Sequence, residues 1–313
     1  MNTSSKRKTL GAFAVGSLGL VLSGVVLAAS NGTVANLIDK RPIIDQMSID
    51  FGAYDPHGDF SSDTNVKIEH LFLPWQDVDL TSLAQADSYA RQRGRSLLIT
   101  VEPWSWSGER NETSDVLLKG ILAGNYNANM GAICAAASNL KSPVTIRWAQ
   151  EMDEPDGQFT WGNWAPGDYI AAYRMMVTEC RKHISTAKFM WSPKGNPALT
   201  AFYPGDDVVD IVGLSVFGLQ QFDKDKFGGE RTFSEALEPG YGLAAKFGKP
   251  VVVAELGYEG DNGYVSSWAK DAAKPHPEFP SLTAVVYFND REVYPWPDNY
   301  GLPNWRVVEQ AIN

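Results

Sequence analysis

Eight short apolar runs recur along the chain after a polar lead-in over residues 31–42, and longer stretches with helical spacing separate them. The runs are apolar on both faces, which is typical of a parallel sheet covered by helices. Eight such units predict an α/β fold of the (β/α)₈ TIM barrel type. A doubly wound open sheet is the competing fold, but no Gly-x-Gly-x-x-Gly follows any run. The expected strands are residues 46–54, 66–75, 96–104, 144–151, 188–193, 208–217, 251–255 and 282–289.

The segments between the runs suit helices. Residues 80–93 place Leu83, Ala86 and Ala90 on one face and are followed by Gly94, a typical helix stop. The same spacing predicts a helix over residues 168–183. Residues 234–247, which run into Gly248, and residues 303–312 are also expected to be helical.

Two apolar runs end in a single carboxylate. Residues 144–153 read Val-Thr-Ile-Arg-Trp-Ala-Gln-Glu-Met-Asp, and residues 249–257 read Lys-Pro-Val-Val-Val-Ala-Glu-Leu-Gly. The strands of a barrel end at one face, where the active site lies, so Glu151 and Glu255 are expected to meet there although 255 − 151 = 104 positions separate them. Two facing carboxylates are the machinery of glycoside hydrolysis. The alternative for the first run is an ordinary strand that enters a solvated loop.

Composition narrows the class of partner. The 313 residues suit a single barrel, and a formal net charge of −10 argues against nucleic acid or anionic lipid and suits a neutral polysaccharide. Ten Trp and twelve Tyr could stack on sugars or fill a large core. No Cys or His stands at metal-ligand spacing, so neither a metal nor another cofactor is expected. We expect a monomer.

The N-terminus has the pattern of an export segment. Basic residues 6–8 precede an apolar stretch over residues 10–29, which ends in small residues. We expect a signal peptide over residues 1–29 and a catalytic domain over residues 30–313, in an exported protein that is periplasmic or secreted. The apolar stretch could also be retained as a membrane anchor, the one case in which membrane contact is expected. Cys134 and Cys180 then form a disulfide or remain two buried thiols.

Four pieces of the chain carry a resemblance to a known family. They are residues 147–153 (Arg-Trp-Ala-Gln-Glu-Met-Asp), 189–193 (Phe-Met-Trp-Ser-Pro), 203–206 with 212–214 (Tyr-Pro-Gly-Asp and Val-Gly-Leu), and 249–257. With them the chain resembles the clan-A glycoside hydrolases, and within that clan family 26, the β-mannanases and related β-glucanases. The resemblance implies that Glu151 is the acid/base, that Glu255 is the nucleophile, and that hydrolysis retains the anomeric configuration through a covalent glycosyl-enzyme.

Three positions depart from the mannanases of that family. Gln150 stands where a His usually precedes the acid/base, Asp153 stands for an Asn, and Phe217 stands for a Tyr. Because these positions touch the sugar in the family, the departures favour a β-glucan over mannan. The expected activity is therefore that of an endo-β-glycanase on a β-linked glucan. The alternatives are a β-mannanase and, in a different class, a polysaccharide-binding barrel that has lost activity.

Side chains at the strand ends and in the following loops are candidates for substrate contact. Arg147 is also expected to hydrogen-bond Glu255, and each aromatic side chain has core packing as its alternative. The candidates are Trp104, Arg147, Gln150, Trp161, Trp191, Phe217, Tyr287 and Trp296.

Overall fold

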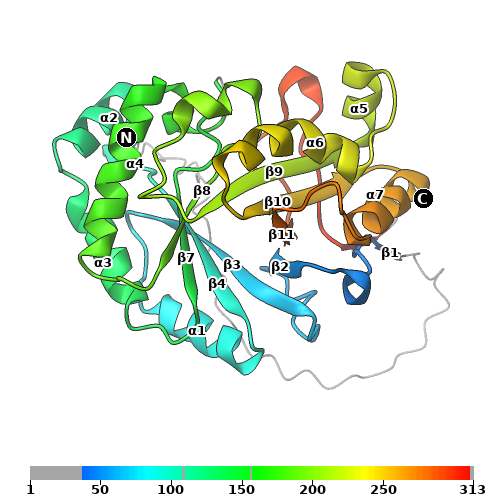
Figure 1. Ribbon diagram of the computed structural model, residues 1–313, viewed down its shortest axis with the longest axis horizontal. Coiled ribbons are helices and arrows are strands. Elements are labelled where there is room, and N and C mark those ends of the chain that lie inside the picture. Colours follow the sequence, from blue (N-terminus) through cyan, green and yellow to red (C-terminus); the bar gives the residue numbers. More distant parts are fainter. Residues whose placement is uncertain (1–36, 108–109, 156, 311–313) are drawn as a thin grey trace, which may run out of the picture.

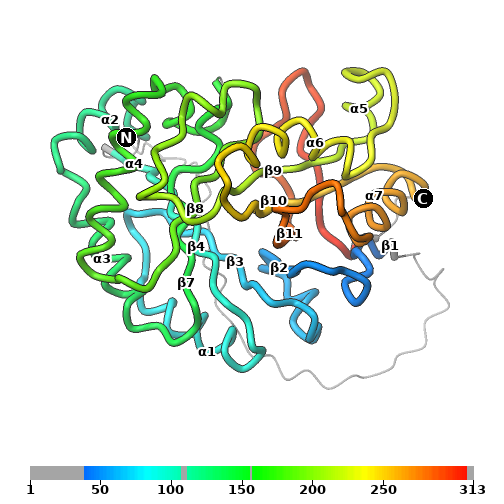
Figure 2. Tube along the Cα trace, in the orientation of Figure 1, coloured from blue at the N-terminus to red at the C-terminus, as the bar shows by residue number. Residues whose placement is uncertain are grey.

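Eight parallel strands close into a barrel in the computed structural model, which describes residues 37–107, 110–155 and 157–310 (Figure 1). The last barrel strand pairs with the first, Val285 opposite Phe51, and Figure 2 shows the two strands side by side. All eight expected strands are present with shifted ends, so the predicted barrel is confirmed. In chain order the strands are β2 (Asp50–Tyr54), β3 (Val66–Pro74), β4 (Ser96–Glu102), β7 (Val144–Trp148), β8 (Lys188–Trp191), β9 (Ile211–Leu219), β10 (Val251–Glu259) and β11 (Leu282–Phe288).

Helices surround the barrel (Figure 1). The expected helices over residues 80–93, 168–183 and 234–247 correspond to α1, α4, and α6 with η4. Pro166 occupies the first turn of α4, where its missing N–H costs no helical bond. The helices are α1 (Ser82–Gln92), α2 (Ser114–Leu122), α3 (Asn127–Ala137), α4 (Pro166–Arg181), α5 (Gln220–Phe227), α6 (Phe233–Ala244) and α7 (Asn262–Ala273), with 3₁₀ turns η1 (Ile44–Gln46), η2 (Thr160–Asn163), η3 (Pro197–Phe202), η4 (Ala245–Phe247) and η5 (Pro297–Asn299).

The expected helix at the C-terminal end of the domain is wrong. Its described part is extended and ends in β12 (Val308–Gln310), and the polar lead-in contains the short strand β1 (Leu37–Asp39). These two strands pair antiparallel. The reason lies in the spacing, because Trp305 and Val307 are both fully buried while Arg306 between them is partly exposed. A period of two suits an extended chain and not a helix. A further two-stranded hairpin, β5 (Trp106–Ser107) and β6 (Arg110–Asn111), follows β4.

The apolar core has two parts. The larger cluster joins strand and helix residues and lies between the barrel and its helices, whereas the smaller cluster contains strand residues only and fills the barrel. Inside the barrel, the side chains alternate along each strand, so this smaller cluster shows which strand positions face inward. Its buried members are Leu98, Met190, Val252, Ala254, Ala284 and Val286.

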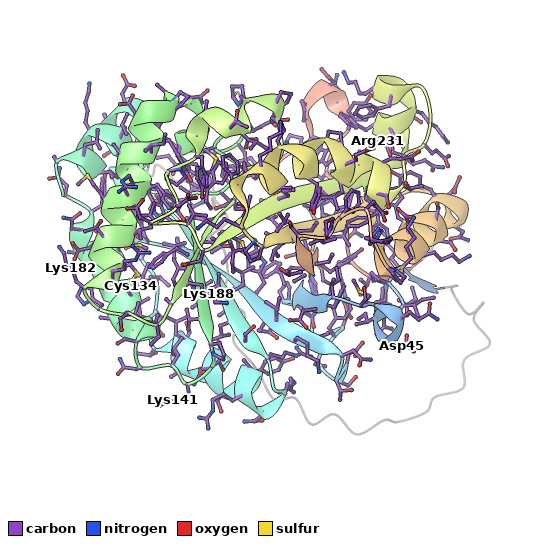
Figure 3. The ribbon with its side chains drawn as sticks, in the orientation of Figure 1. Asp45, Cys134, Lys141, Lys182, Lys188 and Arg231 are labelled. Atoms are coloured by element: carbon purple, nitrogen blue, oxygen red, sulfur yellow. A yellow bond between two sulfur atoms is a disulfide. The ribbon has the colours of Figure 1, made fainter. Side chains whose placement is uncertain are left out.

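Cys134 of α3 and Cys180 of α4 form a disulfide, with an S–S distance of 2.00 Å and a Cα–Cα distance of 5.2 Å. Figure 3 labels Cys134 on the flank where these two helices lie. Of the two alternatives for these cysteines, the structure therefore has the bridge. No helix among the described residues is long and apolar enough to span a bilayer, and the expected export segment over residues 1–29 lies outside them.

Candidate active site

The end of β7 delivers Glu151 to the mouth of the barrel through an unusual turn. Arg147 points inward, as the alternation of the strand requires, and Trp148 packs outward on Tyr169 of α4. The chain then adopts left-handed backbone angles at Ala149 (φ 49°) and Glu151 (φ 56°). Such angles cost a non-glycine residue on the order of 1–3 kcal/mol and concentrate at functional sites. The Glu151 N–H donates to the carbonyl of Ser192 at 2.8 Å, which fixes the turn against the end of β8.

A β-bulge turns Glu255 toward the same mouth. Val252 and Ala254 both face the barrel interior, so regular alternation would point Glu255 outward at the helices. The register of β10 against β9 shifts between Val253 and Glu255, and the pairing with β11 shifts in the same region. An extra residue in a strand re-aims the side chain that follows it. Glu255 therefore faces into the barrel mouth.

The two glutamates line one cavity of about 520 Å³ at the C-terminal ends of the barrel strands. This confirms the expectation that strands 104 positions apart bring Glu151 and Glu255 together. Four of the candidate contact residues line the same cavity, namely Trp104, Gln150, Phe217 and Trp296. Within the described ranges, no group of three or more His, Cys, Asp or Glu side chains is placed to hold a metal ion.

Arg147 lies beneath the cavity and holds Glu255. Its Nη1 donates to Glu255 Oε1 at 2.6 Å, and its side chain is 0% exposed. Arg147 therefore acts through Glu255, as its expected hydrogen bond implied, and its assignment as a substrate contact is wrong. Burial raises the pKa of the Glu255 carboxyl, the Arg147 guanidinium opposes this rise, and the Glu151 carboxylate adds to it.

A second buried carboxylate orients two residues of the cavity wall. Glu102 accepts hydrogen bonds from Gln150 Nε2 at 2.7 Å and from Trp104 Nε1 at 3.1 Å. Burial raises the pKa of Glu102, and these two hydrogen bonds oppose the rise. With its nitrogen occupied, Gln150 presents an Oε1 that has no partner among the described residues. That oxygen is itself buried, as is the Gln150 side chain as a whole.

Three expected contact residues are packed elsewhere, and their assignment to the substrate site is wrong. Trp161, Trp191 and Tyr287 are each 0% exposed, and none of them lines the cavity. Trp161 stacks beneath Phe159 at 4.7 Å and donates to the carbonyl of Gln150. Trp191 packs edge-on against Tyr203 and Phe247, on the outer side of the barrel. The Tyr287 hydroxyl donates to the carbonyl of Trp305 at 2.9 Å.

Asp153 also has a structural role in place of the expected sugar contact. Its carboxylate accepts from the backbone N–H groups of Lys194, Gly195 and Asn196 at 2.6, 3.1 and 2.8 Å. It is 2% exposed and does not line the cavity. Asp153 therefore shapes the loop after β8.

Five charged residues that line the cavity were not anticipated, namely Glu154, Lys194, Asp290, Arg291 and Glu292. Lys194 pairs with Glu154 at 3.0 Å, and although burial lowers the pKa of Lys194, the Glu151 and Glu154 carboxylates raise it by more. Glu292, in the loop after β11, accepts from Trp305 Nε1 at 2.9 Å, and burial raises its pKa. All five follow the ends of barrel strands, which is the signal that could have identified them.

Comparisons with known proteins find similarity to glycoside hydrolases. Residues 109–230 match the model of Glycosyl hydrolase family 26. The chain is 30% identical to a beta-1,3-xylanase of Alcaligenes sp over 116 residues, covering 35% of this chain and 24% of that protein. It is 25% identical to Endoglucanase H of Acetivibrio thermocellus over 262 residues, which cover 78% of this chain and 27% of that protein. The chain thus spans about a quarter of the length of these relatives.

Solved structures extend the likeness of fold. A GH26 β-mannanase from Bacteroides ovatus superposes with a TM-score of 0.60 at 17% identity, over 78% of this chain and 81% of that one. A modular endo-β-1,4-mannanase from Cellulomonas fimi superposes with a TM-score of 0.63 at 16% identity, over 85% of this chain and 74% of that one. At these identities the likeness concerns the fold alone. Through the matched segment and the shared barrel, the chain resembles glycoside hydrolase family 26 of the clan-A glycoside hydrolases.

Proposed function

We propose that the protein is a retaining endo-β-glycanase that cleaves a β-linked polysaccharide through a covalent glycosyl-enzyme. The observation that carries the proposal is the pair Glu151 and Glu255 in one cavity, with the buried guanidinium of Arg147 on Glu255. One carboxylate attacks the anomeric carbon while the other protonates the departing oxygen. The match over residues 109–230, which includes Arg147 and Glu151, supports the same class of activity.

The distribution of charge gives the two glutamates different roles. The 2.6 Å charge-assisted bond from Arg147 stabilises negative charge on Glu255, which suits this residue to attack as a carboxylate, whereas burial and the Glu151 carboxylate raise its pKa to about 8. Glu255 then attacks, and Glu151 protonates the leaving group. Once Glu255 is esterified, the ionised Glu151 takes a proton from water, and the hydroxide formed releases the sugar and restores Glu255.

The proposed substrate is a neutral β-glucan, with β-mannan as the second candidate. Gln150, whose amide nitrogen is bound to Glu102, lines the cavity where mannanases of the family carry His, and Phe217 lacks the hydroxyl of their Tyr. The relatives themselves are named for several polymers, among them a beta-1,3-xylanase, an endoglucanase and two mannan endo-1,4-beta-mannosidases. The two mannosidases support the second candidate.

Hydrolysis of a panel containing mixed-linkage β-glucan, β-1,3-xylan and β-mannan tests the proposal. The purified chain is expected to release oligosaccharides fastest from the β-glucan, and its Glu255→Ala variant is the control for contaminating activity. Faster cleavage of mannan would select the second candidate. Binding to a polymer without any turnover would select the inactive binding barrel, against which the intact pair of glutamates argues.

We also propose that the protein is exported and that residues 1–29 direct this export. The basic and then apolar pattern of that segment supports the proposal, and a disulfide within the domain suits an oxidising compartment. Mass spectrometry of the protein recovered outside the cytoplasm should find an N-terminus near Ser30. Retention of Met1 to Ala29 would indicate an anchor.

A further inference from the structure

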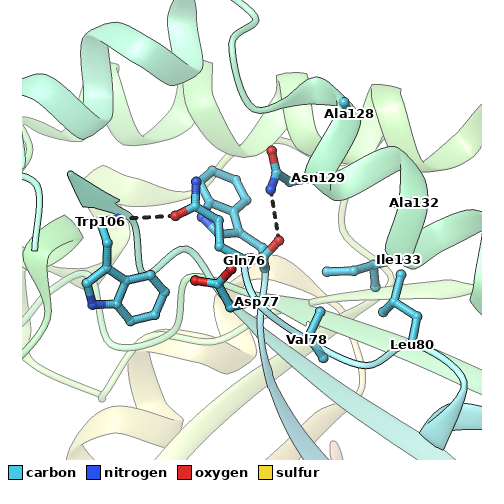
Figure 4. Close-up of a pocket in the computed structure, with 10 residues that line it drawn as sticks. Gln76, Asp77, Val78, Leu80, Trp106, Ala128, Asn129, Ala132 and Ile133 are labelled. Carbon is cyan, nitrogen blue, oxygen red and sulfur yellow. Dashed lines mark hydrogen bonds between the residues drawn. The ribbon is translucent and has the colours of Figure 1, made fainter. Parts of the chain in front are cut away.

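A second hollow of about 640 Å³ lies beside the cavity of the two glutamates, and Figure 4 shows it in close-up. Its walls come from the segment after β3, from Trp106 in β5, and from one face of α3. Among the residues that the structure describes, none lines both this hollow and the cavity, so the two are distinct.

The segment over residues 104–106 separates the two spaces. Its side chains alternate as in any extended chain, so Trp104 lines the cavity and Trp106 lines the second hollow. Ser105 between them is buried, and its hydroxyl accepts from Trp75 Nε1 at 2.9 Å. The Trp106 N–H donates to Gln76 Oε1 at 3.1 Å, as Figure 4 shows. These bonds tie Trp106, which is 36% exposed, to the wall of the hollow.

The polar groups of the hollow are suited to hydroxyl groups. Asn129 Nδ2 donates to the carbonyl of Trp75 at 3.0 Å, which fixes the amide and leaves its oxygen as an acceptor. Within the described residues, the exposed carboxylate of Asp77 makes no hydrogen bond or ion pair. Gln76 contributes a second amide, and Val78, Leu80 and Ile133 form an apolar wall (Figure 4).

The charge of the lining restricts the ligand to a neutral one. Among the described residues that line the hollow, none is Lys, Arg or His, and Asp77 is the one charged side chain. A phosphate, a sulfated sugar or a uronic acid would meet a carboxylate with no cation to hold it. A neutral sugar presents hydroxyl groups along its edge and C–H groups on its face, which match the acceptors and the exposed indole ring.

We infer that this hollow is a second, non-catalytic site for a neutral β-linked oligosaccharide segment. The face of Trp106 stacks on one sugar ring, while Asp77 and Asn129 accept hydrogen bonds from its hydroxyl groups. The class of ligand rests on the proposed function, because the site would retain the same polysaccharide that the neighbouring cavity cleaves. Its contribution is to hold the polymer close to Glu151 and Glu255.

Affinity electrophoresis in gels that contain mixed-linkage β-glucan, β-1,3-xylan or β-mannan tests the inference. All proteins carry Glu255→Ala, so that no polymer is cut. At least one polymer should retard this parent, and adding Trp106→Ala should weaken its apparent affinity about fivefold or more. Asp77→Asn, which keeps a residue type tolerant of the left-handed backbone at this position, should weaken it about twofold. Circular dichroism melting checks that each variant folds.

Phe227→Ala is the matched control, because Phe227 is an exposed aromatic residue (56%) that lines neither space. Its retardation should equal that of the parent. Equal retardation of the Trp106→Ala variant and the parent in every polymer, or no retardation of the parent at all, would overturn the inference. Measuring turnover by the unmodified chain distinguishes a failure of this inference from a failure of the proposed function. Retardation that depends on Trp106, in a chain without any hydrolysis, would leave the second site standing and remove the endo-β-glycanase.

Discussion

Arg147 and Arg95 are two buried arginines with the same kind of partner and different expected roles. Arg147 bonds Glu255 at 2.6 Å at the barrel mouth, whereas Arg95 bonds Glu69 at 2.8 Å outside the active-site cavity. Both guanidinium groups are 0% exposed. The comparison separates the loss of a buried ion pair from the loss of a catalytic contact.

Replacing Arg147 by Lys is expected to lower kcat about a hundredfold or more while the protein still folds. The bonds to Thr100 and Glu255 both come from Nη1, and the lysine side chain ends one bond earlier, so its ammonium nitrogen does not reach that position. Steady-state kinetics and thermal melting are the measurements. Arg95→Lys, the control, should lower the melting temperature with little change in kcat. Near-normal turnover in a folded Arg147→Lys protein would show that Arg147 does not support Glu255.

The pH profile provides an independent readout of the same contact. The nucleophile must be ionised, and Arg147 lowers the pKa of Glu255 against the effects of burial and of Glu151. In Arg147→Gln the guanidinium is absent, so burial and the Glu151 carboxylate raise the pKa of Glu255 without its opposing effect. The acidic limb of kcat/KM on an activated aryl glycoside should therefore move to higher pH, by about one to three units. An acidic limb that stays in place, or that moves to lower pH, would contradict this assignment.

At the scale of elements, the disulfide joins two helices on the flank of the barrel. It closes a separation of 46 positions between α3 and α4, and neither cysteine lines the active-site cavity. In the chain-entropy description, a loop of this length stabilises the fold by roughly 4 kcal/mol. A Cys134→Ala/Cys180→Ala variant should therefore melt several degrees lower and keep its kcat at 25 °C. Thermal melts with and without reductant measure the effect, and an unchanged melting temperature would refute it.

The strand ends show what the sequence could and could not predict. The apolar runs gave all eight barrel strands, and two of them gave Glu151 and Glu255 because a barrel collects its strand ends at one face. The sequence could not show whether a side chain points into the barrel or toward the helices, because these strands are apolar on both faces. Trp191 and Tyr287 therefore seemed equivalent to Trp104, although they pack elsewhere. The bulge that turns Glu255 inward has no signal in an unbroken run of Val and Ala.

At the scale of the whole molecule, long-range pairing supplied what local patterns missed. The C-terminal segment crosses back to the N-terminal one, and Val308 lies opposite Asp39. This return places Trp305 beneath the site, where it meets Phe217 at 5.0 Å and donates to Glu292. A local reading of residues 303–312 as a helix could not anticipate either contact. The wall of the cavity that carries Glu292 and Trp296 thus depends on both ends of the domain.

The central claim, that Glu255 attacks and Glu151 supplies the proton, predicts opposite products when each residue is removed. Glu255→Ala should lower turnover on every substrate by about a thousandfold or more. Glu151→Ala should be severely impaired on polysaccharide yet keep its first step on an activated aryl glycoside, because that leaving group needs no proton. Azide can enter the space that either truncated carboxylate leaves.

The most direct measurement is the anomeric configuration, by NMR, of the glycosyl azide that each variant forms from an aryl β-glycoside. In Glu151→Ala, azide attacks the covalent glycosyl-enzyme and should give the β-azide. In Glu255→Ala, azide attacks from the face of the missing nucleophile and should give the α-azide. The reverse pairing of variants and products would exchange the two roles. Release of product with inverted configuration by the unmodified enzyme would contradict the covalent mechanism and make Glu255 a base that acts on water.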